Sequence, residues 1–281
     1  MTGPLARVLV HRPGPEMAEA DPAEWHYAQP VDLPTVQAQH DAFTALLRAH
    51  GATVEELGGA PGLSDAVFPH DPSLTTPGGA VILRMGKRLR EGEAALHRAF
   101  YEAADIPILG EIEAPGTVEG GDCLWLTPRM LAIGVGPRTN EAGVAQLEAL
   151  LKPHDVVVTP VSLPDADPDG ACLHLMSLVS LLAPDLALVH DDLLPFGFLR
   201  TLNMLGVTMI RAPEDEFEAS ATVSLNVLAT APRRAIMLDG WPKTRAVLET
   251  AGCEVDVFEG ADLCIACEGG PTCLTRPLAR G

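Results

Sequence analysis

The sequence predicts an α/β fold built from five similar units that close into a ring. Three observations support this prediction. A strand–turn–strand–helix–strand pattern recurs five times at intervals of about 50 residues, a period typical of propellers and repeat arrays. The turn falls at a similar position in each unit, and the last strand of the chain has no unit of its own. That strand would complete the first unit by pairing the two ends of the chain.

The first unit shows the local signals behind this interpretation. Residues 7–11 form an apolar run typical of a strand, and a Pro-Gly-Pro turn follows them. Residues 35–50 are expected to form a helix, because Val36 and Phe43 fall on one face and Gly51 ends the pattern. The strand that closes this unit is predicted directly after that glycine, at residues 53–57.

The segment between the first strand and the first helix has no clear period. Residues 16–34 contain Trp25 and Tyr27, two of the few large aromatic residues of the chain. Loops of this length in compact domains are often functional lids. We therefore expect a long loop here.

The other four units repeat the same order of elements. In each unit the order is strand, strand, helix, strand. The second unit has these elements at residues 67–72, 80–85, 91–104 and 106–109, and the third at 119–126, 130–135, 141–151 and 155–161. The fourth unit has them at 172–182, 186–190, 194–205 and 208–211, and the fifth at 223–230, 235–238, 243–251 and 254–258. The final strand is predicted at residues 272–278. An ordinary α/β sheet without internal symmetry is the alternative, since alternating strands and helices alone suggest it.

Composition limits the classes of protein to consider. The 281 residues and the apolar fraction of 47% favour a compact globule of one or two domains. The formal net charge of −19 argues against nucleic acid as a partner, because phosphate contacts need Lys and Arg. No signal peptide or membrane span is indicated, so we expect a soluble, cytoplasmic protein with reduced cysteines. The oligomeric state is not fixed, and a homodimer remains open.

Five polar residues occupy the same position in the five units, at the start of the first strand. They are Asp71, Glu119, His174, Asn226 and Cys273. Singly, each has an ordinary interpretation as a turn residue, a loop charge, a core histidine, a cap or a buried thiol. In a closed ring, these positions would meet at one end of the central axis. The shared position therefore predicts one pocket lined by all five side chains.

These side chains predict a specific chemistry. A thiolate beside a histidine is a pair for covalent catalysis, with the histidine as acid and then base. Two carboxylates without metal-ligand spacing match the planar fork of a guanidinium, which offers five N–H donors. The pocket therefore predicts attack by the Cys273 sulfur on the central carbon of a small cationic guanidine.

Five motifs then resemble a known family, the guanidino-group-modifying enzymes or penteins. They are Phe-Pro-His-Asp at 68–71, Thr-Val-Glu-Gly-Gly-Asp at 117–122, Gly-Pro-Arg-Thr-Asn at 136–140, Leu-His-Leu at 173–175 and Gly-Gly-Pro-Thr-Cys at 269–273. The resemblance covers essentially the whole chain. It implies a five-bladed α/β propeller, with residues 1–281 as a single catalytic domain and no metal or organic cofactor.

The resemblance also implies roles for individual residues. Cys273 would be the nucleophile and His174 the general acid and base, with Glu119 as a further catalytic group. The substrate would be bound by a larger set of side chains: Asp71 and Glu119 at the guanidinium, Arg90 and Arg138 at a substrate carboxylate, and Asn226 and Asp122 in the same pocket.

The particular reaction is less fixed than the class. Arginine deiminases typically carry Asp at the position of Met176 and are longer, so these departures favour a dimethylarginine dimethylaminohydrolase. Against this, His70 stands where many relatives have an acid or Arg, and the C-terminal motif is nearer to deiminases. A deiminase, an amidinotransferase and an inactive binding relative remain alternatives.

Two other motifs are weak. Cys264 and Cys267 form a single C-x-x-C, which lacks the second pair that a closed zinc site needs. The acidic run at residues 165–169 lacks the downstream glutamate of a calcium loop, and we interpret it as a solvated loop.

Overall fold

The computed structural model describes residues 2–164 and 173–281, so the predicted loop at 165–169 lies outside the described residues. The strands within these ranges are β1 (Leu5–Val10), β2 (Thr53–Glu56), β3 (Ser73–Thr76), β4 (Gly79–Ile82), β5 (Ile108–Glu111), β6 (Cys123–Thr127), β7 (Met130–Val135), β8 (Val157–Ser162), β9 (Val179–Ala183), β10 (Leu186–Val189), β11 (Thr208–Arg211), β12 (Leu228–Ala231), β13 (Arg234–Leu238), β14 (Glu254–Phe258) and β15 (Arg276–Arg280).

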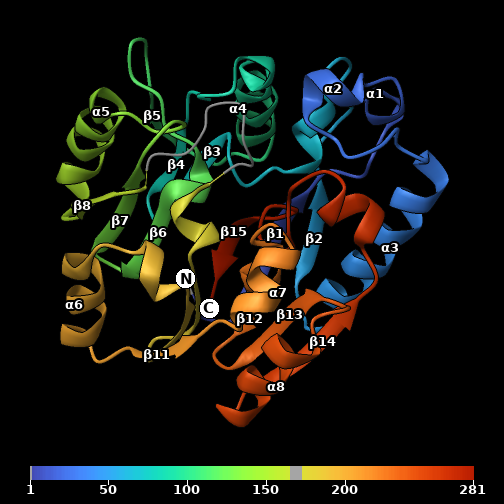
Figure 1. The fold of residues 1–281 in the computed structure, drawn as a ribbon. Helices are drawn as coiled ribbons and strands as arrows, with labels where there is room; N and C mark the ends of the chain where they lie inside the picture. The colour runs from blue at the N-terminus through green and yellow to red at the C-terminus, as the bar shows by residue number, and fades with distance from the viewer. Residues whose placement is uncertain (1, 165–172) are drawn as a thin grey trace.

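These strands form five sheets of three strands, with the orders β15-β1-β2, β3-β4-β5, β6-β7-β8, β9-β10-β11 and β12-β13-β14. In every sheet the first two strands are antiparallel and the third is parallel to the middle one. The C-terminal strand β15 pairs with β1, as the sequence predicts. The two chain ends lie together near the middle of the molecule (Figure 1).

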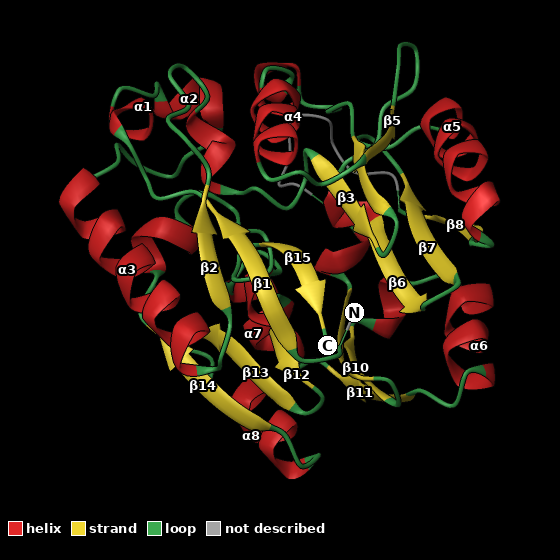
Figure 2. Cartoon of the chain, turned by 180° about the vertical axis from the view of Figure 1, so that it is seen from behind, coloured by secondary structure: helices red, strands yellow, loops and turns green. Residues whose placement is uncertain are grey.

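The helices lie toward the outside of this arrangement (Figure 2). The α-helices are α1 (Pro15–Ala18), α2 (Pro22–Trp25), α3 (Leu33–Ala49), α4 (Glu93–Ala103), α5 (Glu141–Leu151), α6 (Phe196–Met204), α7 (Glu214–Ala219) and α8 (Pro242–Thr250). In each unit one of the longer helices makes the crossover between the two parallel strands. None of the helices in the described ranges combines the length and apolar character that crossing a bilayer requires.

The predicted boundaries differ from the structure in two places that matter for the site. The segment at 16–34 is not a plain loop: Pro15 and Pro22 begin the two short helices α1 and α2, because proline fits the first helical turn. The predicted first strands begin several residues too early. Short 3-10 turns precede them, namely η1 (Ser64–Val67), η3 (Gly120–Asp122), η5 (Leu175–Ser177) and η7 (Val223–Leu225).

This second difference corrects the predicted placement of the five polar residues. Glu119 and His174 are the N-caps of η3 and η5, and Asn226 is the C-cap of η7. Asp71 and Cys273 lie in the turns before β3 and β15. The side chains are therefore held on tight turns and not on the strands.

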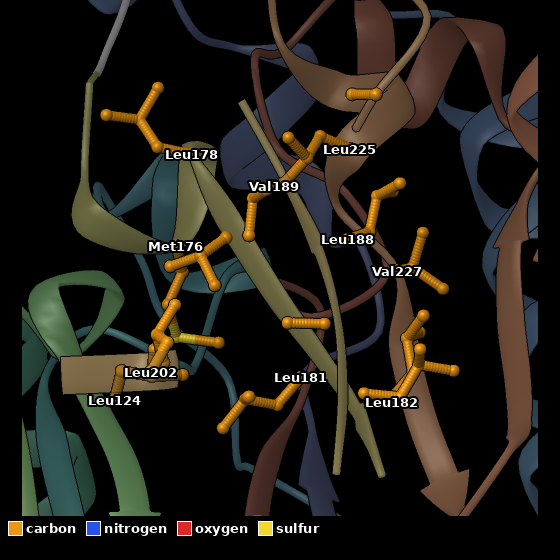
Figure 3. Close-up of a cluster of buried hydrophobic side chains, with 14 of the residues drawn as sticks. Leu124, Met176, Leu178, Leu181, Leu182, Leu188, Val189, Leu202, Leu225 and Val227 are labelled. Carbon is orange, nitrogen blue, oxygen red and sulfur yellow. The ribbon is translucent and has the colours of Figure 1, made fainter. Parts of the chain in front are cut away.

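The largest hydrophobic cluster joins neighbouring sheets. Figure 3 shows side chains of the β9–β10 pair directed to both sides. Leu188 lies toward Val227, which leads into β12, and Leu181 lies on the side of Leu124 of β6. All four are at least nine-tenths buried. Burial of such side chains is the dominant favourable term in folding, so this cluster holds the sheets, and with them the turns, in fixed relative positions.

Candidate active site

One pocket is lined by five of the eight predicted site residues. Asp71, His174 and Cys273 lie on its lining, together with the predicted Arg90 and Arg138. Glu119, Asp122 and Asn226 do not line it and instead contact the residues that do. The fold thus brings the predicted residues together, but in two layers.

Cys273 is placed by the turn that precedes β15. The Asn226 side-chain amide donates to the Cys273 Sγ at 3.2 Å, and the Asn226 carbonyl oxygen accepts from the Thr272 N–H at 2.9 Å. Burial, together with the negative charge of Asp71, raises the pKa of the Cys273 thiol to about 11. The thiol is therefore neutral near pH 7, and a cation beside it would favour the thiolate.

His174 and Glu119 form a buried pair. The His174 Nε2 lies 2.8 Å from a Glu119 carboxylate oxygen, so in the neutral ring Nε2 carries the proton and donates a hydrogen bond to Glu119. The His174 side chain also accepts from the Ser177 N–H in a capping box that closes η5. These two contacts fix the orientation of the imidazole ring, as a carboxylate does in a catalytic triad.

Glu119 is fully buried and satisfied by several donors. One oxygen accepts from the backbone N–H groups of Gly86 and Lys87 at 2.9 and 3.0 Å, and Arg138 donates to both oxygens. Burial alone would raise the pKa of the Glu119 carboxyl, but the hydrogen bond from His174 and the charge of Arg138 hold it well below its usual range. Glu119 therefore stays ionised, and it acts on the pocket through His174 and Arg138.

Asp71 is the predicted acid that faces the pocket. One of its oxygens accepts from the Gly121 N–H at 2.8 Å, and the other accepts from Arg90 at 2.8 Å. Despite burial, which raises the pKa of this carboxyl, the charges of Arg90 and His174 hold it below its usual range. Each oxygen keeps a second lone pair, so Asp71 can still accept from a bound cation.

Arg90 lies on the lining, but its guanidinium is used within the protein. It donates to both oxygens of Glu93 at 2.9 and 2.8 Å, to Asp71, and to the Phe68 carbonyl at 3.0 Å. This geometry makes Arg90 a support for Asp71. Arg138 is the more accessible of the two predicted arginines, with 22% of its side chain exposed.

Asp122 lies behind the pocket. Its carboxylate accepts from the Leu175 N–H at 2.9 Å and from the Thr139 hydroxyl at 2.6 Å. Thr139 in turn accepts from the Glu119 N–H at 3.1 Å. Asp122 therefore connects the turn of Glu119 to the turn of His174, and this hydrogen-bond network joins three of the sequence motifs.

The glycines of the motifs are required by close approach. A Cβ at Gly121 would collide with the His174 ring, and one at Gly270 would collide with the Asn226 side chain. A Cβ at Gly120 would collide with the His70 carbonyl. Each glycine thus lets a site turn pack directly against its neighbour.

Sequence reasoning missed a group at the mouth of the pocket. The Lys87 ammonium donates to Asp65 at 2.7 Å and to the Trp25 carbonyl at 3.0 Å, and it lies 5.3 Å from the centre of the Trp25 ring. Tyr27 donates to the same Asp65 at 2.9 Å. The presence of Trp25 and Tyr27 in the predicted lid was the available signal, and both aromatic residues do contact the pocket wall.

The residues that could hold a metal coincide with the site. Among the described residues, ligand atoms of Asp71, Glu119 and His174 lie within 4.8 Å of one another. Arg90 and Arg138 already pair with the two acids, and their charges oppose a divalent cation there. The C-x-x-C thiols belong to no such group in the parts that the structure describes; Cys264 and Cys267 are buried and free.

Known proteins resemble this chain in sequence and in fold. The sequence model of the arginine deiminase family matches residues 60–196. The N(G),N(G)-dimethylarginine dimethylaminohydrolase of Streptomyces coelicolor is 30% identical over 273 residues, which are 94% of this chain and 96% of that protein. The protein of that name from Pseudomonas aeruginosa is 28% identical over 254 residues, which are 89% of this chain and 91% of that protein.

Solved structures share the fold. A mutant of the Pseudomonas aeruginosa protein complexed with citrulline superimposes with a TM-score of 0.79 at 23% identity, covering 97% of this chain and 98% of that chain. An amidinotransferase from Microseira wollei, in the saxitoxin biosynthetic pathway, gives a TM-score of 0.83 at 18% identity, covering 99% and 95%.

The fold and the site together define a class of α/β proteins that act on guanidino groups. This chain belongs to the guanidino-group-modifying enzymes, the pentein superfamily that contains dimethylarginine dimethylaminohydrolases and arginine deiminases. The resemblance inferred from the sequence motifs is thereby confirmed.

Proposed function

We propose that this protein is a hydrolase that cleaves a C–N bond of a guanidino substrate through a covalent Cys273 intermediate. Nω-methylated arginine or arginine would give citrulline plus an amine or ammonia. The observation that carries this proposal is the pocket in which Cys273, His174 and Asp71 share one lining. The dimethylarginine dimethylaminohydrolases among its relatives support it.

Substrate binding follows from the charges of the pocket. Asp71 accepts hydrogen bonds from the guanidinium, whose planar fork suits a carboxylate. Glu119 lies behind His174 and attracts the substrate cation by its negative charge, because the buried surroundings screen this charge less than water would. Arg138 binds a substrate carboxylate at the pocket wall, while Arg90 holds Asp71 in place.

The first step forms the carbon–sulfur bond. The guanidinium lies beside the Cys273 sulfur and offsets the cost of the thiolate. The thiol proton passes to the Nδ1 of His174, which gives up its hydrogen bond from the Ser177 N–H to accept it. The thiolate attacks the central guanidine carbon. His174 then gives this proton to the departing nitrogen as the C–N bond breaks. A positively charged thiouronium on Cys273 and a neutral amine result, so charge and protons balance.

The second step breaks the carbon–sulfur bond. A water attacks the same carbon, and His174 accepts one of its protons. The tetrahedral intermediate expels the Cys273 sulfur and leaves a ureido product. The second proton of the water restores the thiol, and the proton on His174 leaves with the amine as ammonium. Glu119 holds the imidazole in position and stabilises its charged form throughout.

One observation favours the dimethylarginine reaction over deimination of arginine. Met176, in the position where the resemblance to deiminases implies Asp, is buried in the hydrophobic cluster and does not line the pocket. No third acid is therefore supplied from this position to bind an unsubstituted guanidinium nitrogen.

We also infer the larger organisation from the same data. The five sheets act as the blades of one propeller, with residues 1–281 as a single catalytic domain. Such an enzyme needs no partner beyond its small cationic substrate, and a homodimer is compatible with the fold.

The test is formation of ureido product by the purified protein from Nω,Nω-dimethylarginine and from arginine in parallel, with Cys273→Ser as control. We expect turnover of the dimethylated substrate that the substitution abolishes. Preference for arginine would reassign the protein to the deiminases, and turnover only with an added amine acceptor would reassign it to the amidinotransferases. An unreactive Cys273 without any turnover would refute catalysis.

A further inference from the structure

The nucleophile and the acid of the site come from different sheets. Cys273 precedes β15, which pairs with β1, whereas Asp71 precedes β3 of the next sheet. The strands β15 and β3 are neighbours in space, but no ladder of backbone hydrogen bonds joins them. The relative position of the thiol and the carboxylate therefore depends on other contacts across this boundary, which we call the β15–β3 seam.

His70, the residue before Asp71, crosses the seam in both directions. Its backbone N–H donates to the Cys273 carbonyl at 3.3 Å, and its ring Nδ1–H donates to the Thr275 carbonyl at 2.8 Å. The Arg276 guanidinium donates to the His70 carbonyl in return. Three hydrogen bonds thus join the neighbour of Asp71 to the turn that carries Cys273.

The burial of these two residues is hard to explain by stability alone. His70 is 2% exposed and Arg276 is 4% exposed. Arg276 makes no ion pair with any described residue, and its Nε has no hydrogen-bond partner. The charge of Asp71 acts favourably on Arg276, but Asp71 makes its ion pair with Arg90. Burying a charge without a direct ion pair is unfavourable, and a hydrophobic residue of similar size is often more stable there. A positioning role gives a reason for an arginine at this point.

The ring of His70 is suited to a fixed contact. Burial, and then the positive charge of Arg276, lowers the pKa of His70 to about 3. The ring is therefore neutral wherever the enzyme is expected to work, and its single N–H is committed to the Thr275 carbonyl. Gly120 completes this arrangement, because a Cβ there would collide with the His70 carbonyl and with Arg276.

We propose that His70 and Arg276 are positioning residues that set the distance between the Cys273 sulfur and the Asp71 carboxylate across the β15–β3 seam. This inference rests on the proposed function, since it gives that distance a catalytic meaning. The two residues do not touch the reacting atoms. They act through the backbone of Cys273 and Asp71, so their loss should lower the rate of the covalent step more than it weakens binding.

The test compares two alkylating reagents of the same shape. Chloroacetamidine is a cation that needs the acid correctly placed beside the thiol, whereas chloroacetamide is neutral and needs only the thiol. The ratio of their alkylation rates at Cys273 measures the placement without requiring turnover. The variants are His70→Leu, Arg276→Met and His70→Asn, which keeps a side-chain N–H donor.

Thr75→Val is the matched control. The Thr75 hydroxyl donates to the Pro277 carbonyl at 2.7 Å, so its loss removes a seam hydrogen bond of the same type, farther along β15 from Cys273. Thermal unfolding of each variant establishes that it is folded and reports any loss of stability.

We expect the rate ratio to fall about tenfold or more in His70→Leu and Arg276→Met, since small misplacements of reacting groups cost up to about 10²-fold. It should recover substantially in His70→Asn and stay at the wild-type value in Thr75→Val. With a substrate that is turned over, kcat should fall while KM changes little. Equal ratios in His70→Leu and Thr75→Val would overturn the proposal. A wild-type ratio no higher than that of a free thiol would refute the guanidinium site itself, which is a separate result.

Discussion

Replacing Asp71 by Asn should make Cys273 more reactive toward a neutral alkylating reagent while it removes turnover. The negative charge of Asp71 is, after burial, the main influence that raises the pKa of the Cys273 thiol. The same charge is proposed to hold the substrate cation. The substitution keeps the shape of the side chain and removes only the charge, so the two effects can be separated.

The magnitude follows from the pKa of the thiol. Burial first, and then the charge of Asp71, raises this pKa from 9.0 to about 11, so removing the charge should bring the pKa part of the way back toward 9.0. One unit is about 1.4 kcal/mol and a tenfold change in the thiolate fraction below the pKa. The hydrogen bonds of Arg90 to Glu93 do not involve Asp71, so Arg90 should stay in place in the variant.

The assay is the pH dependence of alkylation by iodoacetamide, followed by mass spectrometry of the Cys273 peptide. In the wild type the rate should rise tenfold for each unit of pH until it levels off near pH 11, because only the thiolate reacts. In Asp71→Asn the whole profile should move to lower pH and level off between pH 9.0 and about 11. An unchanged or slower rate in a folded variant would refute the electrostatic account of the thiol.

Two further predictions concern the second layer of the site. Gly121→Ala should lower kcat about 10²-fold with little change in KM, because the added Cβ would displace the His174 ring. Gly197→Ala is the control and should leave kcat unchanged, because no atom lies within 4 Å of the added Cβ. Equal kinetics in the two variants would contradict the packing argument. The pKa of the Glu119 carboxyl is lowered in the folded protein, so its stabilising contribution is present above about pH 4.5 and is lost as the pH falls toward the folded-state pKa. The midpoint of thermal unfolding should therefore fall less steeply with acidification in Glu119→Gln than in the wild type, and parallel curves down to about pH 3 would show that this pKa is not lowered.

The sequence was informative about the repeat because each unit carries its own local signals. The helix at 141–151 and the strand at 254–258 are found at the predicted boundaries. Asn140 accepts from the Gly143 N–H as an N-cap, which is a purely local interaction. Pairing of the C-terminal strand with β1 also followed, since a strand without a partner needs one.

The roles of the charged residues could not be obtained in the same way. Whether Arg90 faces a substrate or supports Asp71 depends on its contacts with Asp71 and with the Phe68 carbonyl, which lie 19 and 22 residues away in the sequence. The same holds for Asp122, whose partners lie 17 and 53 residues away. Such contacts are set by how the sheets pack together, and the pattern of one strand or helix does not contain them.

The two layers of the site explain how one fold can place reactive groups so closely. Each unit supplies one side chain from the turn before its first strand, and the neighbouring unit supplies the groups that orient it. Asp71 is held by the Gly121 N–H of the next unit, and His174 is held by Glu119 of the preceding one. Because these contacts run from unit to unit, neither Asp71 nor His174 is held in position by its own unit alone. The β15–β3 seam, which joins the turn of Asp71 to the segment that carries Cys273, is therefore where we propose that the geometry of Cys273 is set.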